Sequence, residues 1–176
     1  MKRSAERGFT LVEIMIVVAI IALLAAIAIP NVLRGRTSAN ESAAIGNLRA
    51  LVSSLEMYRS VNQYYPDTTT GWLAAMYGAD CNAGTTPDPD FGPPSFCVAM
   101  SASPIQGYSY TYLGGAASNA STYNINANPV DLGRTGTRTF WITEAGVTYH
   151  CSGKNTTTVK PAAVTATIDT TPAACP

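Results

Sequence analysis

The hydrophobic pattern of the chain begins with a long, uniformly apolar run. Between Glu13 and Arg34 lie 20 consecutive residues without a charge, and they show no polar face at the helical period. At a rise of about 1.5 Å per residue, such a run forms roughly 30 Å of helix, the thickness of the hydrocarbon core of a bilayer. The pattern therefore predicts a membrane-spanning helix over residues 9–34.

After this run the pattern becomes amphipathic. Apolar residues recur at three- and four-residue steps, and charged residues such as Arg49 and Glu56 fall between them. The apolar stripe consists of Ile45, Leu48, Leu51, Val52, Leu55 and Tyr58. We expect one helix that begins near Thr10, continues through residues 35–62 and ends near Asn62, with its second half packed against the rest of the chain.

Pro30 lies inside this predicted helix. Proline removes one backbone hydrogen bond and its ring clashes with the preceding turn. We therefore expect a kink or a local loosening of the helix at Pro30. Gly35 follows shortly afterwards and weakens the helix further.

The remainder of the chain reads as loops followed by strands. Residues 63–106 are rich in glycine and proline, which favour turns, and only residues 72–77 suggest a short helix or a turn packed on the long helix. Residues 107–176 show the period-two alternation of strands, with a glycine-containing hairpin connection at 144–146. The predicted strands are 108–113, 121–126, 138–143 and 147–150, with 163–168 as a candidate edge strand. The predicted fold class is α+β, a long helix packed against a small antiparallel sheet.

Four cysteines, Cys81, Cys97, Cys151 and Cys175, follow the apolar run. An even number of cysteines in an exported domain predicts two disulfides, for which three connectivities exist. We favour Cys81–Cys97 and Cys151–Cys175, because local closure suits a loop and a C-terminal tail. Metal binding by these cysteines is disfavoured, since their spacing contains no C-x-x-C and His150 is the single histidine.

The composition limits the possible partners. Only 12% of residues are charged, and 11 basic residues balance 11 acidic ones, so no overall basic character points to nucleic acid. Three of the basic residues lie in residues 1–8, ahead of the apolar run. A basic segment before a membrane span places the N-terminus in the cytoplasm and the following chain across the membrane.

The residues around the start of the apolar run carry a specific motif. A short basic leader, residues 1–8, precedes Gly8-Phe9-Thr10-Leu11-Val12-Glu13. This motif resembles the class III signal of type IV pilins and the related pseudopilins, and Pro30 falls where that family places a helix-kinking proline. Within the family the chain most resembles a type IVa major pilin. The resemblance is sharp over about residues 7–35 and general beyond them.

The resemblance implies roles for three residues. A prepilin peptidase would cleave after Gly8 and methylate the new N-terminal residue, Phe9. Glu13 would pair with the N-terminal amine of Phe9 in a neighbouring subunit during assembly. The implied partners are further copies of the chain in a helical filament, the prepilin peptidase, an inner-membrane assembly platform, minor pilins, and the membrane before assembly; the sequence does not tell whether nucleic acid is a partner.

Three simpler interpretations of the N-terminal segment explain less of it. A plain membrane anchor needs neither a glutamate nor the Gly8–Phe9 junction. A secretory signal peptide is suggested by the small residues Ala26 and Ala28, but the apolar run is longer than an ordinary h-region and Glu13 interrupts it. The buried helix of a soluble protein would show a polar face.

No catalytic arrangement or cofactor site is recognisable in the sequence. His150 lies in a predicted strand and reads as a structural or surface histidine, and there is no phosphate-binding loop or nucleophile elbow. Asp80, Asp88 and Asp90 lack the spacing and the terminal glutamate of a calcium loop, so we expect no metal there.

The function expected from the sequence is therefore structural. The leading hypothesis is a pilin that polymerises through its N-terminal helix into a type IV pilus for attachment, motility or DNA uptake. The alternatives are a pseudopilin of a type II secretion system, with a periplasmic filament, and a minor pilin. Pseudopilins of that system commonly bind calcium near the C-terminus, whereas Asp169 is the single acid after Glu144 here. A membrane-anchored enzyme or ligand-binding domain is a remote alternative.

Overall fold

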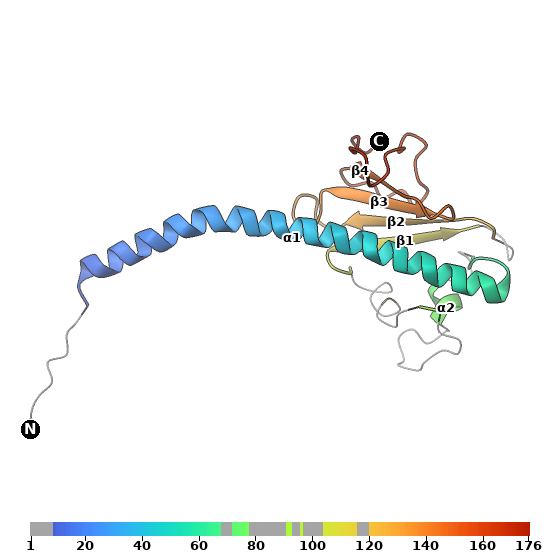
Figure 1. Ribbon diagram of the computed structural model, residues 1–176, viewed down its shortest axis with the longest axis horizontal. Helices are drawn as coiled ribbons and strands as arrows, with labels where there is room; N and C mark the ends of the chain where they lie inside the picture. The colour runs from blue at the N-terminus through green and yellow to red at the C-terminus, as the bar shows by residue number, and fades with distance from the viewer. Residues whose placement is uncertain (1–8, 68–71, 78–90, 93–95, 97–103, 116–119) are drawn as a thin grey trace, which may run out of the picture. The chain divides into compact units, whose positions relative to one another are not determined.

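The computed structural model describes residues 9–67, 72–77, 91–92, 96, 104–115 and 120–176. Its elements are two helices followed by four strands (Figure 1). They are α1 (Leu11–Asn62), α2 (Trp72–Tyr77), β1 (Tyr108–Gly114), β2 (Tyr123–Pro129), β3 (Arg138–Thr143) and β4 (Thr148–Ser152). The chain divides into two units, residues 1–36 and residues 37–176. The proposed leader, residues 1–8, lies outside the described residues.

In the first unit, α1 presents apolar side chains on every side. Large hydrophobic residues from Leu11 to Leu33 are exposed, most of them by half or more of their surface. The length and hydropathy of this part of α1 suffice to cross a membrane. The helix is assigned without a break through Pro30, and the kink expected there stays a prediction.

In the second unit, one stripe of α1 is buried against the sheet. Leu48, Leu51 and Leu55 are fully buried and Tyr58 is nearly so, as the amphipathic pattern predicted. Ile45 and Val52, at the sides of the stripe, are half-buried. The stripe also contains a buried carboxylate, which the hydrophobic pattern did not predict: Glu41 is only 6% exposed.

The four strands form an antiparallel meander in the order β1-β2-β3-β4. The α+β prediction is therefore confirmed, as are the short helix α2 and the tight turn between β3 and β4. In that turn Gly146 has φ 71° and its N–H donates to the carbonyl of Thr143. A Cβ at this φ would be strained, which is why glycine suits the position.

Two strand predictions need correction. The second strand covers Tyr123–Pro129 rather than 121–126. Residues 163–168 form no strand; Thr167 makes only an isolated bridge to Tyr149, and the carbonyl of Ala166 accepts a hydrogen bond from the N–H of His150. The segment therefore covers part of the β4 edge without extending the sheet.

The sheet carries a core on each face. Phe140 and Ile142 of β3 face the helix and join the main core, whereas Trp141 between them belongs to a second, smaller cluster with Cys151 and Val164. This alternation follows from the period-two geometry of a strand. The second cluster is closed by the residues that follow β4, so this sheet is covered on both faces.

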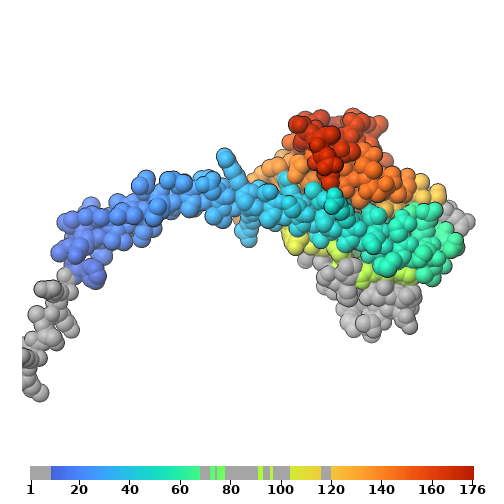
Figure 2. Space-filling model, in the orientation of Figure 1, coloured from blue at the N-terminus to red at the C-terminus, as the bar shows by residue number. Residues whose placement is uncertain are grey.

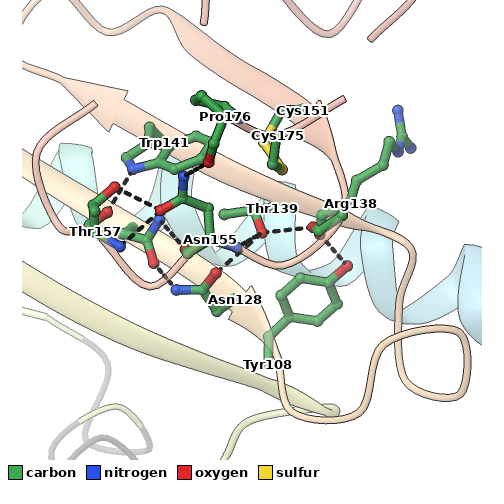
Figure 3. The surroundings of a disulfide bond; sticks show 12 residues. Tyr108, Asn128, Arg138, Thr139, Trp141, Cys151, Asn155, Thr157, Cys175 and Pro176 are labelled. Carbon is green, nitrogen blue, oxygen red and sulfur yellow. Dashed lines mark hydrogen bonds between the residues drawn. A yellow bond between two sulfur atoms is a disulfide. The ribbon is translucent and has the colours of Figure 1, made fainter. Parts of the chain in front are cut away.

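The residues after β4 are held by a disulfide and by a buried polar network (Figure 3). Cys151 and Cys175 form a disulfide with a Cα–Cα distance of 4.9 Å. Asn155 donates its backbone N–H to the hydroxyl of Thr139, at 3.1 Å, and the indole of Trp141 donates to the carbonyl of Thr157, at 2.9 Å. The second expected pair, Cys81 and Cys97, lies outside the described residues.

Candidate assembly site

The N-terminus of α1 is closed by a reciprocal hydrogen-bond motif. The backbone N–H and the hydroxyl of Thr10 both donate to Oε2 of Glu13, each at 2.8 Å. The N–H of Glu13 donates back to the hydroxyl oxygen of Thr10 at 3.3 Å. This is a capping box, in which a threonine and a glutamate three residues later satisfy two otherwise unpaired helix N–H groups.

The capping box shows that Glu13 has a role within its own chain. The sequence prediction assigned Glu13 only an intermolecular role and omitted Thr10. The spacing Thr-x-x-Glu ahead of an apolar run would have identified the motif. The Thr10 hydrogen bonds reach one carboxylate oxygen, and an ionised carboxylate has about four acceptor positions. Oε1 of Glu13 therefore retains acceptor capacity for a donor from another molecule.

Phe9 lies next to this motif and is 84% exposed. The apolar side chains that follow it are exposed as well, so the described residues provide no apolar cover for this end of α1. Such a surface requires lipid or other apolar protein around it. Gly8, the other residue of the predicted cleavage site, lies outside the described residues.

A second group of polar residues lies where α1 meets β3. Oε1 of Glu41 accepts hydrogen bonds from the backbone N–H of Thr137, at 2.7 Å, and from its hydroxyl, at 2.6 Å. Oε2 of Glu41 accepts from Nε of Arg138 at 2.8 Å and forms an ion pair with Nη2 at 2.8 Å. Burial alone raises the pKa of Glu41, but the Thr137 and Arg138 contacts outweigh it and the net pKa is lowered.

Arg138 connects Glu41 to the buried His150. Nη1 of Arg138 donates a hydrogen bond to Nδ1 of His150 at 3.1 Å. Nε2 of His150 in turn donates to the carbonyl of Thr170, also at 3.1 Å. These partners assign a neutral imidazole with its proton on Nε2. Burial, followed by the Arg138 charge, lowers the pKa of His150, against a raising effect of the Thr170 carbonyl. His150 is therefore part of a structural network that runs from α1 to the C-terminal residues.

No group of three or more acidic, histidine or cysteine side chains in the described part of the chain is placed to hold a metal ion. Asp80, Asp88 and Asp90, which the sequence analysis considered for calcium, lie outside that part.

The N-terminal segment matches a known family model. Residues 3–29 match the model described as the prokaryotic N-terminal methylation motif. They include the residues of the capping box and most of the apolar run. The start of this chain is therefore similar to the N-terminal segment of type IV pilin-like proteins.

Several proteins that this chain resembles in sequence are named as components of type II secretion systems. The chain is 39% identical over 76 residues to the type II secretion system core protein G of Klebsiella michiganensis, which covers 43% of this chain and 54% of the relative. The corresponding protein of Escherichia coli K12 is 41% identical over 66 residues, covering 38% and 46%. That of Pseudomonas aeruginosa is 41% identical over 76 residues, covering 43% and 54%.

This chain thus spans about half the length of the curated relatives it matches. More than half of its own residues lie outside these alignments. No solved structure matches it.

Proposed function

We propose that the protein is a structural subunit of the pseudopilin kind, which polymerises through α1 into a periplasmic filament of a type II secretion system. The observation that carries the proposal is the likeness to proteins named type II secretion system core protein G. It favours the pseudopilin over the pilus subunit that the sequence alone suggested. In this proposal the protein is a building block and carries out no reaction of its own.

Processing would precede assembly. A prepilin peptidase would cleave between Gly8 and Phe9 and methylate the amine of Phe9, as the match to the methylation motif suggests. Until assembly the subunit would wait in the inner membrane, with residues 9–34 in lipid. An assembly platform in that membrane and minor subunits would be its further partners.

Assembly exchanges one apolar environment for another, because the exposed side chains of α1 leave lipid and meet other helices. Apolar burial alone therefore gives little selectivity between neighbours. Glu13 supplies selectivity, since a carboxylate in hydrocarbon is costly unless it is paired. The Thr10 hydrogen bonds offset part of that cost in a single subunit, and Oε1 accepts the amine of Phe9 from the next subunit.

A type IV pilus subunit is the second candidate. The disulfide between Cys151 and Cys175 favours it, because such a closed C-terminal region is typical of many pilins. In that case the filament lies on the cell surface rather than in the periplasm, and the same N-terminal chemistry applies.

The decisive experiment measures the N-terminus and the intact mass of the protein in a sheared cell-surface fraction and in the envelope. Processed protein beginning at N-methylated Phe9 and confined to the envelope supports the pseudopilin. The same species in long sheared fibres supports the pilus subunit. A chain that begins at Met1, or after Ala28, contradicts both. Secretion of reporter proteins in a deletion strain separates the two functions further.

A further inference from the structure

The end of the sheet where β2 leads into β3 has exposed apolar side chains next to basic ones. We call residues 130–136, which join the two strands, the β2–β3 loop. Leu132 of this loop is 55% exposed, and Val130 is 36% exposed. Arg134 of the loop and Lys154, which contacts it, are exposed as well. Figure 2 shows the loop, in orange, at the surface of the 37–176 unit.

Hydrogen bonds fix the conformation of the β2–β3 loop. The N–H of Thr135 donates to the carbonyl of Asp131 at 2.9 Å, and the N–H of Asp131 donates to the hydroxyl oxygen of Thr135 at 3.1 Å. Gly133, with φ 82°, donates its N–H to the carbonyl of Gly136 at 2.8 Å. These bonds hold Leu132 away from the core. One exposed leucine is ordinary by itself, so its meaning depends on what surrounds it.

The surroundings of Leu132 are basic. The ammonium of Lys154 donates one N–H to the carbonyl of Val130 at 2.9 Å, which keeps its charge beside the loop and leaves two N–H groups for other acceptors. Among the described residues, the guanidinium of Arg134 has no acid partner. Asp131 offsets one of these two charges. An apolar tip with net positive charge is the composition of segments that bind anionic lipid surfaces.

The loop is attached to the part of α1 that follows the apolar run. The side-chain amide of Asn40 donates to the carbonyl of Thr135 at 2.9 Å. Only six residues of chain lead from Arg34, where the apolar run ends, to Asn40, a reach of at most about 22 Å in any conformation. Arg34 and Arg36 on this stretch are two further basic residues. A span that lies in a bilayer therefore keeps the β2–β3 loop within reach of the lipid headgroups.

We propose that the β2–β3 loop docks on the membrane surface before assembly. Leu132 enters the interface of the bilayer, and Arg134 and Lys154 contact the phosphates of anionic lipids. The inference rests on the proposed function only in placing the span in the inner membrane. Docking restrains the orientation of the 37–176 unit on the membrane, and the loop leaves the lipid when the subunit enters a filament.

Other exposed apolar positions of the same unit fit this contact less well. Val61 lies 21 residues beyond Asn40, which is about 32 Å along the helix. Val147 lies in the turn between β3 and β4, at the opposite end of the strands from the β2–β3 loop. That turn contains Glu144 rather than a cation, and an anionic surface repels a carboxylate.

Quenching by lipid tests the contact in the full chain. Val130→Cys and Val147→Cys place one fluorescent thiol label at two valines of equal exposure, 36%, at opposite ends of the strands. The chain is inserted at low density into vesicles of phosphatidylglycerol and phosphatidylcholine that contain a lipid with a quencher in its headgroup. Only chain that stays with the vesicles after alkaline extraction is measured. The label at residue 130 is expected to be quenched, and the label at residue 147 is not. Unsubstituted chain treated with the label corrects for reaction of the native cysteines.

Further substitutions in the Val130→Cys chain distinguish docking from nearness. Leu132→Ser removes the apolar tip and is expected to relieve the quenching. Arg134→Gln lowers the ratio of docked to free loop by about fivefold, the effect of one basic residue at an anionic surface, and Arg134→Lys restores it. Lys154→Gln acts like Arg134→Gln, and vesicles of phosphatidylcholine alone abolish the effect of both. Val159→Ser, at a valine of 53% exposure on the C-terminal segment, leaves the quenching unchanged.

The remaining outcomes decide against the inference or against the proposed function. Equal quenching at residues 130 and 147, or quenching at 130 that persists in Leu132→Ser and in both charge variants, overturns the inference because it reports nearness alone. Quenching of a label on Val159→Cys without quenching at 130 assigns the contact to another face and also overturns it. Docking by a chain that in cells is neither processed at Phe9 nor assembled supports the loop surface and contradicts the proposed function. A chain that assembles in the periplasm but never docks does the reverse.

Discussion

The carboxylate of Glu41 on α1 lies 2.8 Å from Nη2 of Arg138 on β3, although the two residues are 97 positions apart in the chain. Glu41 also accepts two hydrogen bonds from Thr137, the residue before β3. The pair therefore fixes the helix to the start of β3 in a way that apolar packing does not. Buried pairs of this kind contribute specificity of packing, while their loss leaves a charge without a partner.

Removal of this carboxylate is expected to destabilise the globular part. Glu41→Ala leaves Nε and Nη2 of Arg138 and the Thr137 N–H without their acceptor, and loss of one partner of a buried pair costs about 3–5 kcal/mol. We expect the lower end of that range, because the side chain of Arg138 keeps 28% exposure. Urea unfolding of the processed full chain in detergent measures the effect, with Glu144→Ala as an exposed control. A change below about 1 kcal/mol, the range of a surface pair, would contradict the structural role.

Stability is expected to fall on acidification. The folded-state pKa values of Glu41 and His150 both lie below their ordinary values, so the unfolded chain binds more protons. The contribution of His150 to the stability of the fold is complete above about pH 6.5, its pKa in the unfolded chain. This contribution is lost as the pH falls through the lower pKa that His150 has in the folded chain. The Glu41 contribution is lost in the same way below about pH 4.3.

The pH dependence can be assigned by substitution. The free energy of unfolding is measured between pH 7 and pH 3 for the full chain and for His150→Gln. The decrease that begins near pH 6.5 is expected to disappear in the variant, while the decrease at lower pH remains. If the decrease that begins near pH 6.5 is unchanged in His150→Gln, another group titrates in that pH range.

The disulfide is expected to stabilise the C-terminal residues. Cys151 and Cys175 are 24 positions apart, and closure of a loop of that length stabilises by about 3 kcal/mol on the chain-entropy model. Substitution of both by serine should lower the free energy of unfolding by about that amount. Hydrogen exchange at the N–H groups of His150 and Ser152, which donate to Ala166 and Ala173, should accelerate. Unchanged exchange at both positions would show that the tail holds without the crosslink.

Assembly is expected to depend on the charge of Glu13. Glu13→Gln keeps an oxygen that can accept the Thr10 hydrogen bonds, so α1 and its insertion in the membrane should be unchanged. The neutral amide cannot form the ion pair with a neighbouring amine, and filaments should be absent. The measurement compares the membrane-inserted and filamentous fractions, with Thr10→Ser as a variant that preserves both capping and charge. Normal filament yield from Glu13→Gln would contradict the role proposed for the carboxylate.

The hydrophobic pattern predicted the elements that depend on local sequence. The end of α1 at Asn62 and its buried stripe follow from apolar residues at helical spacing. The Gly146 turn follows from the need for a left-handed residue. These features were predictable because their causes lie within a few residues of one another.

Glu41 could not be predicted in this way. It lies on the same side of the helix as Ala44 and Leu48, but a carboxylate there reads as a solvent-facing residue unless its partner is known. The partner, Arg138, is brought near only by the folded sheet. The same reason explains why β2 continues beyond the predicted end at residue 126: Asn128 suggests an exposed loop, whereas it is buried in the fold.

The segment that covers the edge of β4 has a consequence for the chain before Cys151 and Cys175 are oxidised. An open strand edge offers unpaired N–H and C=O groups that recruit strands from other chains into aggregates. Here Ala166 and Ala173 occupy that edge, and the bond to Cys175 ties the covering segment down. Before the disulfide forms, the covering segment is held by these hydrogen bonds and by the packing of Val164 against Trp141. We therefore expect formation of the disulfide to lower the tendency of β4 to pair with strands of other chains.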